Sequence, residues 1–267
     1  MARSLPSHEL ERLAAAATGR TRAALLAAPV ADPDERARLD ALVGRRLAGE
    51  PLQYLEGSIP FGPVEVQVDR RALIPRPETE QLWELPGGLL GEAGPGTPLV
   101  DVGTGSGALA LALKQAFPFA PVYGIDLSAA ALDLARQNAA SNRLEVTFLE
   151  GDLLEPLPAG LRGRVEMIVS NPPYLSEAEW EALPDEIRLH EPREALVAGP
   201  EGTEVLARIA AEAYWWLGVG GWVICEIGET QGEAALGLFG AYESEVRADL
   251  AGRPRFLVAR KGAPCCR

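Results

Sequence analysis

Hydrophobic and polar positions repeat with a helical period in the first part of the chain and alternate as in strands after it. This change of period divides the sequence into two parts. In the first 50 residues leucines recur at helical spacing, as in SHELERLAAAAT and PDERARLDALVGRRLAGE. Ser7 and Asp32 stand where helix caps are expected, and Pro33 occupies a tolerated first-turn position. The pattern predicts a small helical domain over residues 1–50.

The pattern becomes extended after Pro51. Val64, Val66 and Val68 alternate with polar residues after a Gly-Pro turn, which is typical of a strand in a β-hairpin. The Gly- and Pro-rich segment LPGGLLGEAGPGTP at 85–98 predicts a loop and a domain boundary. We therefore expect a β-hairpin and linker over residues 51–84 and a further domain over residues 85–267.

That last domain is predicted to have an α/β fold. Apolar strand candidates alternate with helical stretches in the order PLVDVG, ALALALKQAF, PVYGID, AALDLARQNAA, EVTFLEG, VEMIVSNPP, TEVLARIAAEAYWWL and GGWVICEIG. Such alternation favours a parallel sheet with helices on both faces. The closing segment SEVRADLAGRPRFLVARKG instead predicts two antiparallel strands about a Gly-Arg-Pro turn.

Length and apolar content indicate a globular protein. The 267 residues, 47% of them hydrophobic, are enough for one large domain and a smaller one. No apolar run reaches the roughly 18 residues of a membrane span. The opening MARSLPSHELERL lacks the apolar block of a signal peptide, so we expect a cytoplasmic protein with no membrane partner.

The charge is uneven. Residues 1–50 carry eight Arg and seven acidic residues, a net charge of +1. Because the whole chain has a net charge of −13, residues 51–267 carry −14. An acidic surface repels a phosphate backbone, and this disfavours a nucleic acid as a stable partner.

Histidine and cysteine are scarce. His8 and His190 are the only histidines, so the sequence favours chemistry that needs no histidine base. Cys225, Cys265 and Cys266 have neither metal-ligand spacing nor a disulfide pattern, and no metal site is predicted.

The first chemical motif is DVGTGSG, between a predicted strand and helix. Glycines there let the backbone turn sharply and approach a ligand closely. The letters also fit a dinucleotide-binding loop, or a tight turn that only packs a helix on a strand. An acid before the glycines would repel a pyrophosphate but suits a cationic amino-acid cofactor. The candidate cofactor-binding residues of this loop are Asp101, Gly103, Thr104, Gly105, Ser106 and Gly107.

Two more acidic residues follow the next two strand candidates. Asp126 ends GID, where an acid can bind both hydroxyls of a ribose, and Asp152 ends EGD, near the expected place of an adenine amine. An Asp after a strand is also a common helix cap, and this alternative stays open for Asp152. Glu226, at a later strand end in CEIGETQ, is interpreted as structural.

The segment IVSNPPYLS interrupts a β-branched strand with an asparagine and two prolines. Proline has no N–H and makes the preceding residue extended, so the loop is stiff and offers acceptors: the Asn171 side-chain oxygen and the Pro172 carbonyl. Two fixed acceptors suit a planar NH₂ group, whose flat face Tyr174 can cover. The alternative is a proline-rich turn that only ends a strand.

DVGTGSG, GID, GD and NPPY, in this order, resemble the class I methyltransferases that modify planar amino or amide nitrogens. The resemblance implies a Rossmann-like, mostly parallel seven-stranded sheet with an antiparallel C-terminal hairpin. It also implies S-adenosyl-L-methionine as cofactor and S-adenosyl-L-homocysteine as product. Adenine-amine DNA methyltransferases and protein-glutamine methyltransferases both share these motifs.

Further segments, from about residue 51 to the C-terminal region, are similar to the HemK/PrmC family, which methylates the glutamine of the Gly-Gly-Gln motif in peptide chain release factors. They are PLQYLEG, LIPRPETE, EPREALVAGPEGTEVLARI, EIGETQ and DLAGRPRFLVAR. Two departures are Trp83, where an aliphatic residue is expected, and Leu153, where relatives often have a bulkier side chain.

The family resemblance implies further roles. Leu153 is expected on the adenine side of the cofactor, and Pro173 beside the substrate amide. Arg76 and Pro77 in LIPRPETE are expected over the cleft, shaping the glutamine pocket, and the helices of residues 1–50 form a docking surface for the release factor. LIPRPETE could instead be a rigid linker before a helix, and the helices only a packed bundle.

Other function classes remain possible on the motifs. A nucleic-acid adenine methyltransferase shares NPPY but should carry a basic recognition face. A glutamine methyltransferase of another protein, such as a ribosomal protein, would have the same catalytic motif. A non-catalytic cofactor-binding module would have no use for the Asn-Pro-Pro acceptors.

Overall fold

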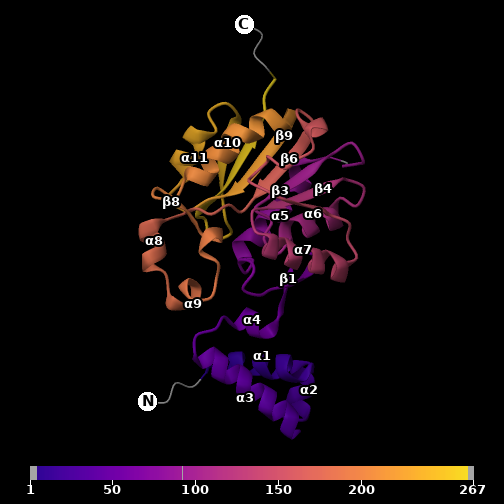
Figure 1. The fold of residues 1–267 in the computed structure, drawn as a ribbon, viewed down its shortest axis with the longest axis vertical. Helices are drawn as coiled ribbons and strands as arrows, with labels where there is room; N and C mark the ends of the chain where they lie inside the picture. Colours follow the sequence, from indigo (N-terminus) through magenta and orange to yellow (C-terminus); the bar gives the residue numbers. More distant parts are fainter. Residues whose placement is uncertain (1–4, 92, 264–267) are drawn as a thin grey trace.

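The computed structural model describes residues 5–91 and 93–263, so Cys265 and Cys266 lie outside the described residues. It has a helical unit at one end and a larger α/β unit at the other (Figure 1). The helical unit consists of α1 (Ser7–Thr18), α2 (Arg22–Ala27), α3 (Pro33–Leu47) and α4 (Leu52–Glu56).

The helical unit has its own small core, in which α4 takes part. Leu13 of α1 is buried against Leu52 and Leu55 of α4. The α4 residue Tyr54 instead belongs to the core of the α/β unit, and its hydroxyl donates to the Ala72 carbonyl at 3.1 Å. We therefore propose that α4, just after the expected boundary at residue 50, is the joint between the two units.

The expected helix starts differ in one detail. Asp32 caps α3, because its carboxylate accepts the backbone N–H groups of Asp34 and Glu35 at 2.9 Å. Ser7 is not a cap: it is the first residue of α1, and Pro6 stands at the cap position without a side-chain hydrogen bond.

A hairpin and a helix connect the units. The hairpin pairs β1 (Ser58–Phe61) with β2 (Val64–Gln67), as the alternating valines predicted. The helix α5 (Pro77–Leu89) runs through the boundary expected between residues 84 and 85, so the predicted loop at 85–98 is wrong for residues 85–89. Leu82, Leu85 and Leu89 share one apolar face against the core, and this burial holds the helix through Pro86.

The α/β unit contains the predicted seven-stranded sheet, in the order β10-β11-β9-β6-β3-β4-β5. From β9 to β5 all neighbours are parallel, whereas β11 is antiparallel to β9 and β10. The closing antiparallel hairpin is thus confirmed. The strands are β3 (Leu99–Val102), β4 (Val122–Asp126), β5 (Thr147–Glu150), β6 (Val165–Ser170), β9 (Leu217–Glu226), β10 (Glu243–Ala248) and β11 (Pro254–Arg260).

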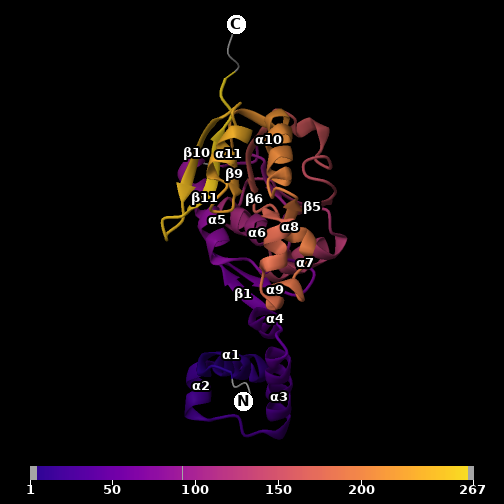
Figure 2. The same ribbon diagram turned by 90° about the vertical axis from the view of Figure 1, so that its left-hand side faces the viewer.

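Helices cover both faces of this sheet, and each face has its own core (Figure 2). On one face pack α5, α6 (Ala108–Ala116) and α7 (Ala129–Asn142). On the other pack α10 (Glu204–Trp216) and α11 (Gly232–Leu238).

A long connecting segment, the excursion, joins β6 to α10 and lies outside the main sheet. It contains β7 (Leu175–Ser176), α8 (Glu177–Ala182), α9 (Asp185–Arg188), η2 (Arg193–Ala195) and β8 (Val197–Gly199); η1 (Ala159–Leu161) precedes β6. The excursion reaches the helical unit, because Arg46 of α3 forms an ion pair with Glu186 of α9 at 3.1 Å.

The strand order reverses beside β3. The chain passes from β3 to β4 and β5 on one side and then to β6 on the other. Val102 and Ser170 are paired in register at the carboxyl ends of β3 and β6, and the Ser170 hydroxyl donates to the Val102 carbonyl at 2.7 Å. Ligands of open α/β sheets bind at such a reversal.

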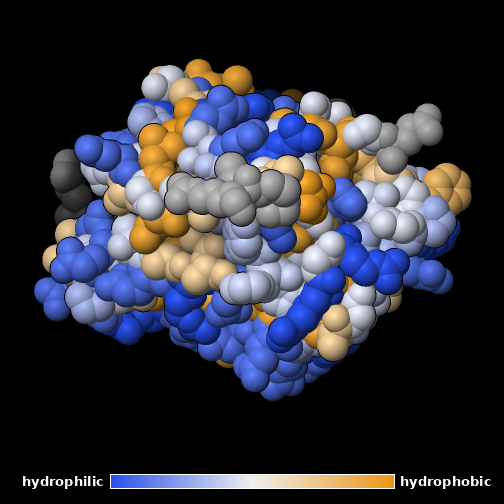
Figure 3. Space-filling view, turned by 90° about the horizontal axis from the view of Figure 1, so that it is seen from above, coloured by the Kyte–Doolittle hydropathy of each residue, from blue (hydrophilic) through white to orange (hydrophobic). Residues whose placement is uncertain are grey.

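The far end of the molecule, opposite the helical unit, shows hydrophobic residues scattered among hydrophilic ones (Figure 3). Two exposed apolar side chains, Trp215 and Val219, lie where α10 passes into β9. Within residues 5–91 and 93–263, no helix is both long and apolar enough to cross a membrane.

Candidate active site

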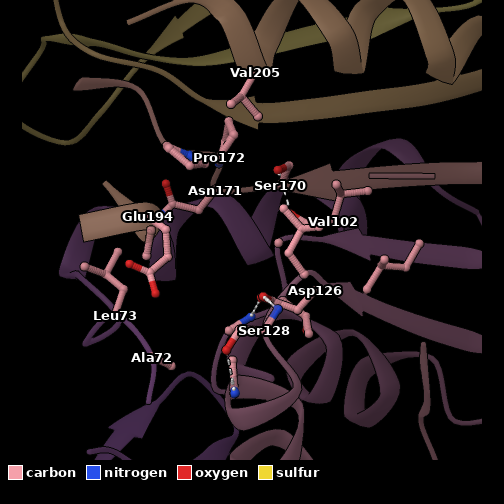
Figure 4. A pocket seen from close by; sticks show the side chains of 18 of the residues that line it. Ala72, Leu73, Val102, Asp126, Ser128, Ser170, Asn171, Pro172, Glu194 and Val205 are labelled. Atoms are coloured by element: carbon pink, nitrogen blue, oxygen red, sulfur yellow. Dashed lines mark hydrogen bonds between the residues drawn. The ribbon is translucent and has the colours of Figure 1, made fainter. Parts of the chain in front are cut away.

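A cavity of about 430 Å³ lies at the carboxyl ends of β3, β4 and β6 (Figure 4). In Figure 4, Asn171 and Pro172 lie on one side of it, Asp126 and Ser128 on another, and Leu73 and Glu194 beside it. The sequence-predicted residues that line it are Gly103, Thr104, Gly105, Ser106, Asp126, Asp152, Leu153, Asn171, Pro172 and Pro173.

Five other predicted residues stand outside the cavity wall: Asp101, Gly107, Tyr174, Arg76 and Pro77. Gly107 is the last residue of the glycine loop, directly before α6, and Asp101 is buried behind that loop. Pro77 is the first residue of α5, where its missing N–H costs no helical hydrogen bond.

The glycine loop connects β3 to α6. Gly107 has φ +84°, and a Cβ added to it would lie 3.1 Å from the Cβ of Ala135 in α7. Glycine is therefore required there for packing as well as for backbone shape. Gly103 has φ +70° with open space around it, as expected where a ligand approaches the backbone.

Asp101 holds this loop from below. It is fully buried, and its Oδ2 accepts the Thr104 hydroxyl at 2.6 Å and the Ala110 N–H at 3.0 Å. Its Oδ1 is buried with no hydrogen-bond partner among the described residues. Burial raises the pKa of Asp101 to about 7, against the opposing effect of these two hydrogen bonds.

Asp126 ends β4 and lines the cavity. Its Oδ2 accepts the Gly105 N–H at 2.8 Å, and its Oδ1 accepts the Ser128 N–H at 2.9 Å (Figure 4). Burial raises the pKa of this carboxyl group. Each oxygen uses one lone pair on the backbone and can still accept a ligand hydroxyl.

Asp152 follows β5 and is not a simple helix cap. Its Oδ2 forms an ion pair with Arg208 of α10 at 2.8 Å, and its Oδ1 is buried with no partner among the described residues. Leu153, which follows it, has φ +47°, a conformation that is rare for a leucine. Such strain is common in loops that bind ligands.

Asn171 is the first residue after β6. Its Nδ2 donates to the Thr79 hydroxyl at 3.0 Å, and that hydroxyl donates to Glu226 Oε2 at 2.8 Å. The Tyr174 hydroxyl donates to Glu226 Oε1 at 3.3 Å. Tyr174 thus turns toward Glu226 rather than lining the cavity, and Glu226 belongs to the surroundings of the site.

Two loops brace the cavity from outside. Glu191, buried beneath them, accepts Arg76 Nη2 at 2.5 Å and the Ile74 N–H at 3.2 Å. This ties the segment before α5, which supplies Leu73 and Pro75 to the wall, to the segment that supplies Pro192 and Glu194. Arg76 therefore acts on the cavity only through Glu191.

Sequence reasoning missed Thr79, the third residue of α5, and left Glu226 out of the site. A threonine in a first helical turn looks like an ordinary helix start. It is distinguished by its burial, its place on the cavity wall and its position between Asn171 and Glu226.

Comparison with known proteins finds two family models on the chain. Residues 2–57 match the PrmC N-terminal domain, and residues 90–201 match the Methyltransferase small domain.

Curated relatives match most of the chain. A release factor glutamine methyltransferase of Deinococcus radiodurans is 45% identical over 86% of this chain and 81% of its own. Those of Mycolicibacterium smegmatis and Streptomyces coelicolor are 40% and 38% identical, over 96% and 97% of this chain and 91% and 92% of theirs.

Solved structures support the fold. A methyltransferase from Pyrococcus furiosus has a TM-score of 0.56 at 18% identity, covering 75% of this chain and 90% of its own. A 16S rRNA methyltransferase of Thermus thermophilus, solved with AdoMet and guanosine, has a TM-score of 0.53 at 22% identity, covering 76% of this chain and 49% of its own. At these identities the likeness concerns the fold alone.

Proposed function

The chain belongs to the release factor glutamine methyltransferase family, and we propose that it methylates the glutamine side-chain amide in the Gly-Gly-Gln motif of a peptide chain release factor, with S-adenosyl-L-methionine as methyl donor. The observation that carries this proposal is the position of Asn171 and Pro172, two fixed hydrogen-bond acceptors, on the wall of a cavity that also contains Asp126 and Asp152.

Three acidic residues at or behind the cavity support this choice of cofactor. Asp126 would accept the ribose hydroxyls, and the unpartnered Asp152 Oδ1 would accept the adenine amine. The unpartnered Asp101 Oδ1 lies behind the glycine loop and suits the cationic amino-acid end. When bound, the cofactor supplies an electron-poor sulfonium methyl group, and the protein supplies binding and orientation.

Asn171 and Pro172 would hold the glutamine amide. Because Asn171 Nδ2 donates to Thr79, its Oδ1 is the end of the amide left for a substrate N–H, and no described residue donates to that oxygen. The Pro172 carbonyl is a second acceptor held by a stiff backbone. Two acceptors match the two N–H groups of one primary amide.

These contacts address the difficulty of the reaction. An amide nitrogen is a poor nucleophile because its lone pair is delocalised into the carbonyl group. Acceptors on both N–H groups orient the nitrogen, and they bind more strongly as positive charge develops on it. The alkylated amide is acidic and can release its proton to solvent, which is consistent with a cavity lined by neither His8 nor His190.

The test is methyl transfer from labelled S-adenosyl-L-methionine to separate substrates: an intact release factor, the same factor with its motif glutamine replaced, a ribosomal protein and duplex DNA. We expect label only on the intact factor. Label on the altered factor would place the methyl group elsewhere, and label only on DNA would support an adenine-amine methyltransferase instead.

The proposal also sets the expected partners and compartment. Release factors act in translation termination, so we expect the enzyme in the cytoplasm, with a protein substrate and without a stable nucleic-acid or membrane partner.

A further inference from the structure

We propose that Thr79 and Glu226 are positioning residues that orient the Asn171 side chain, so that its oxygen and not its NH₂ group faces the substrate. This inference rests on the proposed function. It adds a role for Glu226, which lies outside the cavity wall, and for Thr79, which lines the cavity and acts through Asn171. It explains why the residue after β6 is connected to the first turn of α5 and to the last residue of β9.

The connection is a chain of hydrogen bonds with a defined direction. While the Glu226 carboxyl group is ionised, the Thr79 hydroxyl donates its single hydrogen to Glu226 Oε2 at 2.8 Å. Toward Asn171 the hydroxyl oxygen can therefore only accept, and it accepts Nδ2 at 3.0 Å.

The direction matters because the two ends of an asparagine amide have nearly the same shape. Turning the amide of Asn171 over would exchange its oxygen for an NH₂ group on the substrate side. A substrate amide that presents N–H groups would then meet a donor instead of an acceptor, and the stabilising hydrogen bond would be lost.

Burial shields this series of hydrogen bonds. Thr79, on the cavity wall, is 4% exposed and Glu226 only 1%, so little solvent reaches their hydrogen bonds. At the other end Glu226 Oε1 accepts the Tyr174 hydroxyl at 3.3 Å. Each Glu226 carboxylate oxygen therefore accepts one hydrogen bond, Oε2 from the Thr79 hydroxyl and Oε1 from the Tyr174 hydroxyl.

Tyr174 takes a new role on this basis. It would contribute through its hydroxyl, at the far end of the chain, rather than by covering the substrate with its ring. Asn171 and Tyr174, at the two ends of this series of hydrogen bonds, therefore belong to the same loop after β6.

The experiment compares three single variants and one double variant in single-turnover methyl transfer to a release factor at saturating cofactor. Thr79→Val has the shape of threonine without the hydroxyl, and Thr79→Ser keeps the hydroxyl. Asn171→Ala removes the group that is positioned, and Asn171→Ala/Thr79→Val combines both changes.

We expect Thr79→Val to slow methyl transfer by roughly 10- to 100-fold, because about 90–99% of the molecules would then present the wrong end of Asn171. Thr79→Ser should stay within about threefold of wild type, and cofactor affinity should be unchanged in both. The double variant should be no slower than Asn171→Ala, since Thr79 acts only through Asn171.

Two results would overturn the inference: a Thr79→Val rate equal to wild type, or losses that multiply in the double variant. If Thr79→Val does not fold, Thr79→Ala, which also lacks the hydroxyl, enters the same comparison with the same expectations. A wild-type protein that methylates no release factor would overturn the proposed function as well, whereas an active wild type with unaffected Thr79 variants rejects the inference alone.

Discussion

Asn171 is the residue on which the proposed chemistry depends most directly. Replacing it with alanine removes one preorganised acceptor, so we expect Asn171→Ala to reduce the single-turnover rate by roughly 10²–10³ with little change in cofactor affinity. Asp126→Ala is the matched control: it should weaken cofactor binding, measured by calorimetry, by about 1–3 kcal/mol. Near-wild-type methyl transfer by Asn171→Ala would contradict the role given to the loop after β6.

Asp101 gives a prediction about pH. Its folded-state pKa of about 7 lies above the ordinary 3.8, so between these values the folded protein holds a proton that the unfolded chain releases. The contribution of Asp101 to stability therefore falls as the pH rises from about 4 to about 7, and stays constant above.

The measurement is the melting temperature of wild type and of Asp101→Asn between pH 5 and pH 8, without cofactor. Asparagine keeps an acceptor for Thr104 and Ala110 but does not titrate. We expect the wild type to lose stability relative to Asp101→Asn as the pH rises. A constant difference between the two proteins would mean that Asp101 has the same pKa in both states.

At the scale of elements, the turn between β3 and α6 sets how closely the helix packs. Gly107→Ala should lower the free energy of unfolding by roughly 1–2 kcal/mol, because alanine is strained in the left-handed conformation. The close contact of the new Cβ with Ala135 should lower it further. Gly103→Ala, with a similar φ but open space, is the control and should lose only the first part. Urea unfolding checks this, and an equal or larger loss for Gly103→Ala would show that the packing against α7 is not limiting.

At the scale of the whole molecule, the helical unit lies at one end, next to the α/β unit (Figure 1), and we propose it as a docking surface for a large substrate. A variant lacking residues 1–50, with Leu52 and Leu55 changed to serine because they lose their core, keeps Tyr54 and the cavity. We expect its cofactor affinity to be nearly intact. Methylation of an intact release factor should fall much more than methylation of a short peptide that contains the glutamine, because only the large substrate reaches the helices.

Initial rates on both substrates decide this prediction. Equal losses on the two would mean that the helices only stabilise the fold. In that case α1, α2 and α3 would be a packed bundle and not a docking surface.

Much of this protein could be predicted from local pattern. Strand and helix alternation, the antiparallel end and the sequence positions of Gly103, Asp126, Asp152 and Asn171 depend on short stretches of chain. In a parallel sheet the carboxyl ends of strands meet at one edge, so knowing the strands is enough to bring these residues together.

Only the tertiary structure decided what the side chains contact. Thr79, Asn171 and Glu226 come from three elements separated by 92 and 147 residues of sequence, counted from Thr79, and no periodicity connects them. The same holds for Arg76, expected at the pocket but paired with Glu191, and for Tyr174, expected on the substrate but bound to Glu226. The sequence by itself determined that the strand-end residues Asp126, Asp152 and Asn171 meet at one edge of the sheet, because strand direction follows from local pattern. The orientation of the Asn171 side chain was decided by packing, because a hydrogen-bond partner far along the chain selects it.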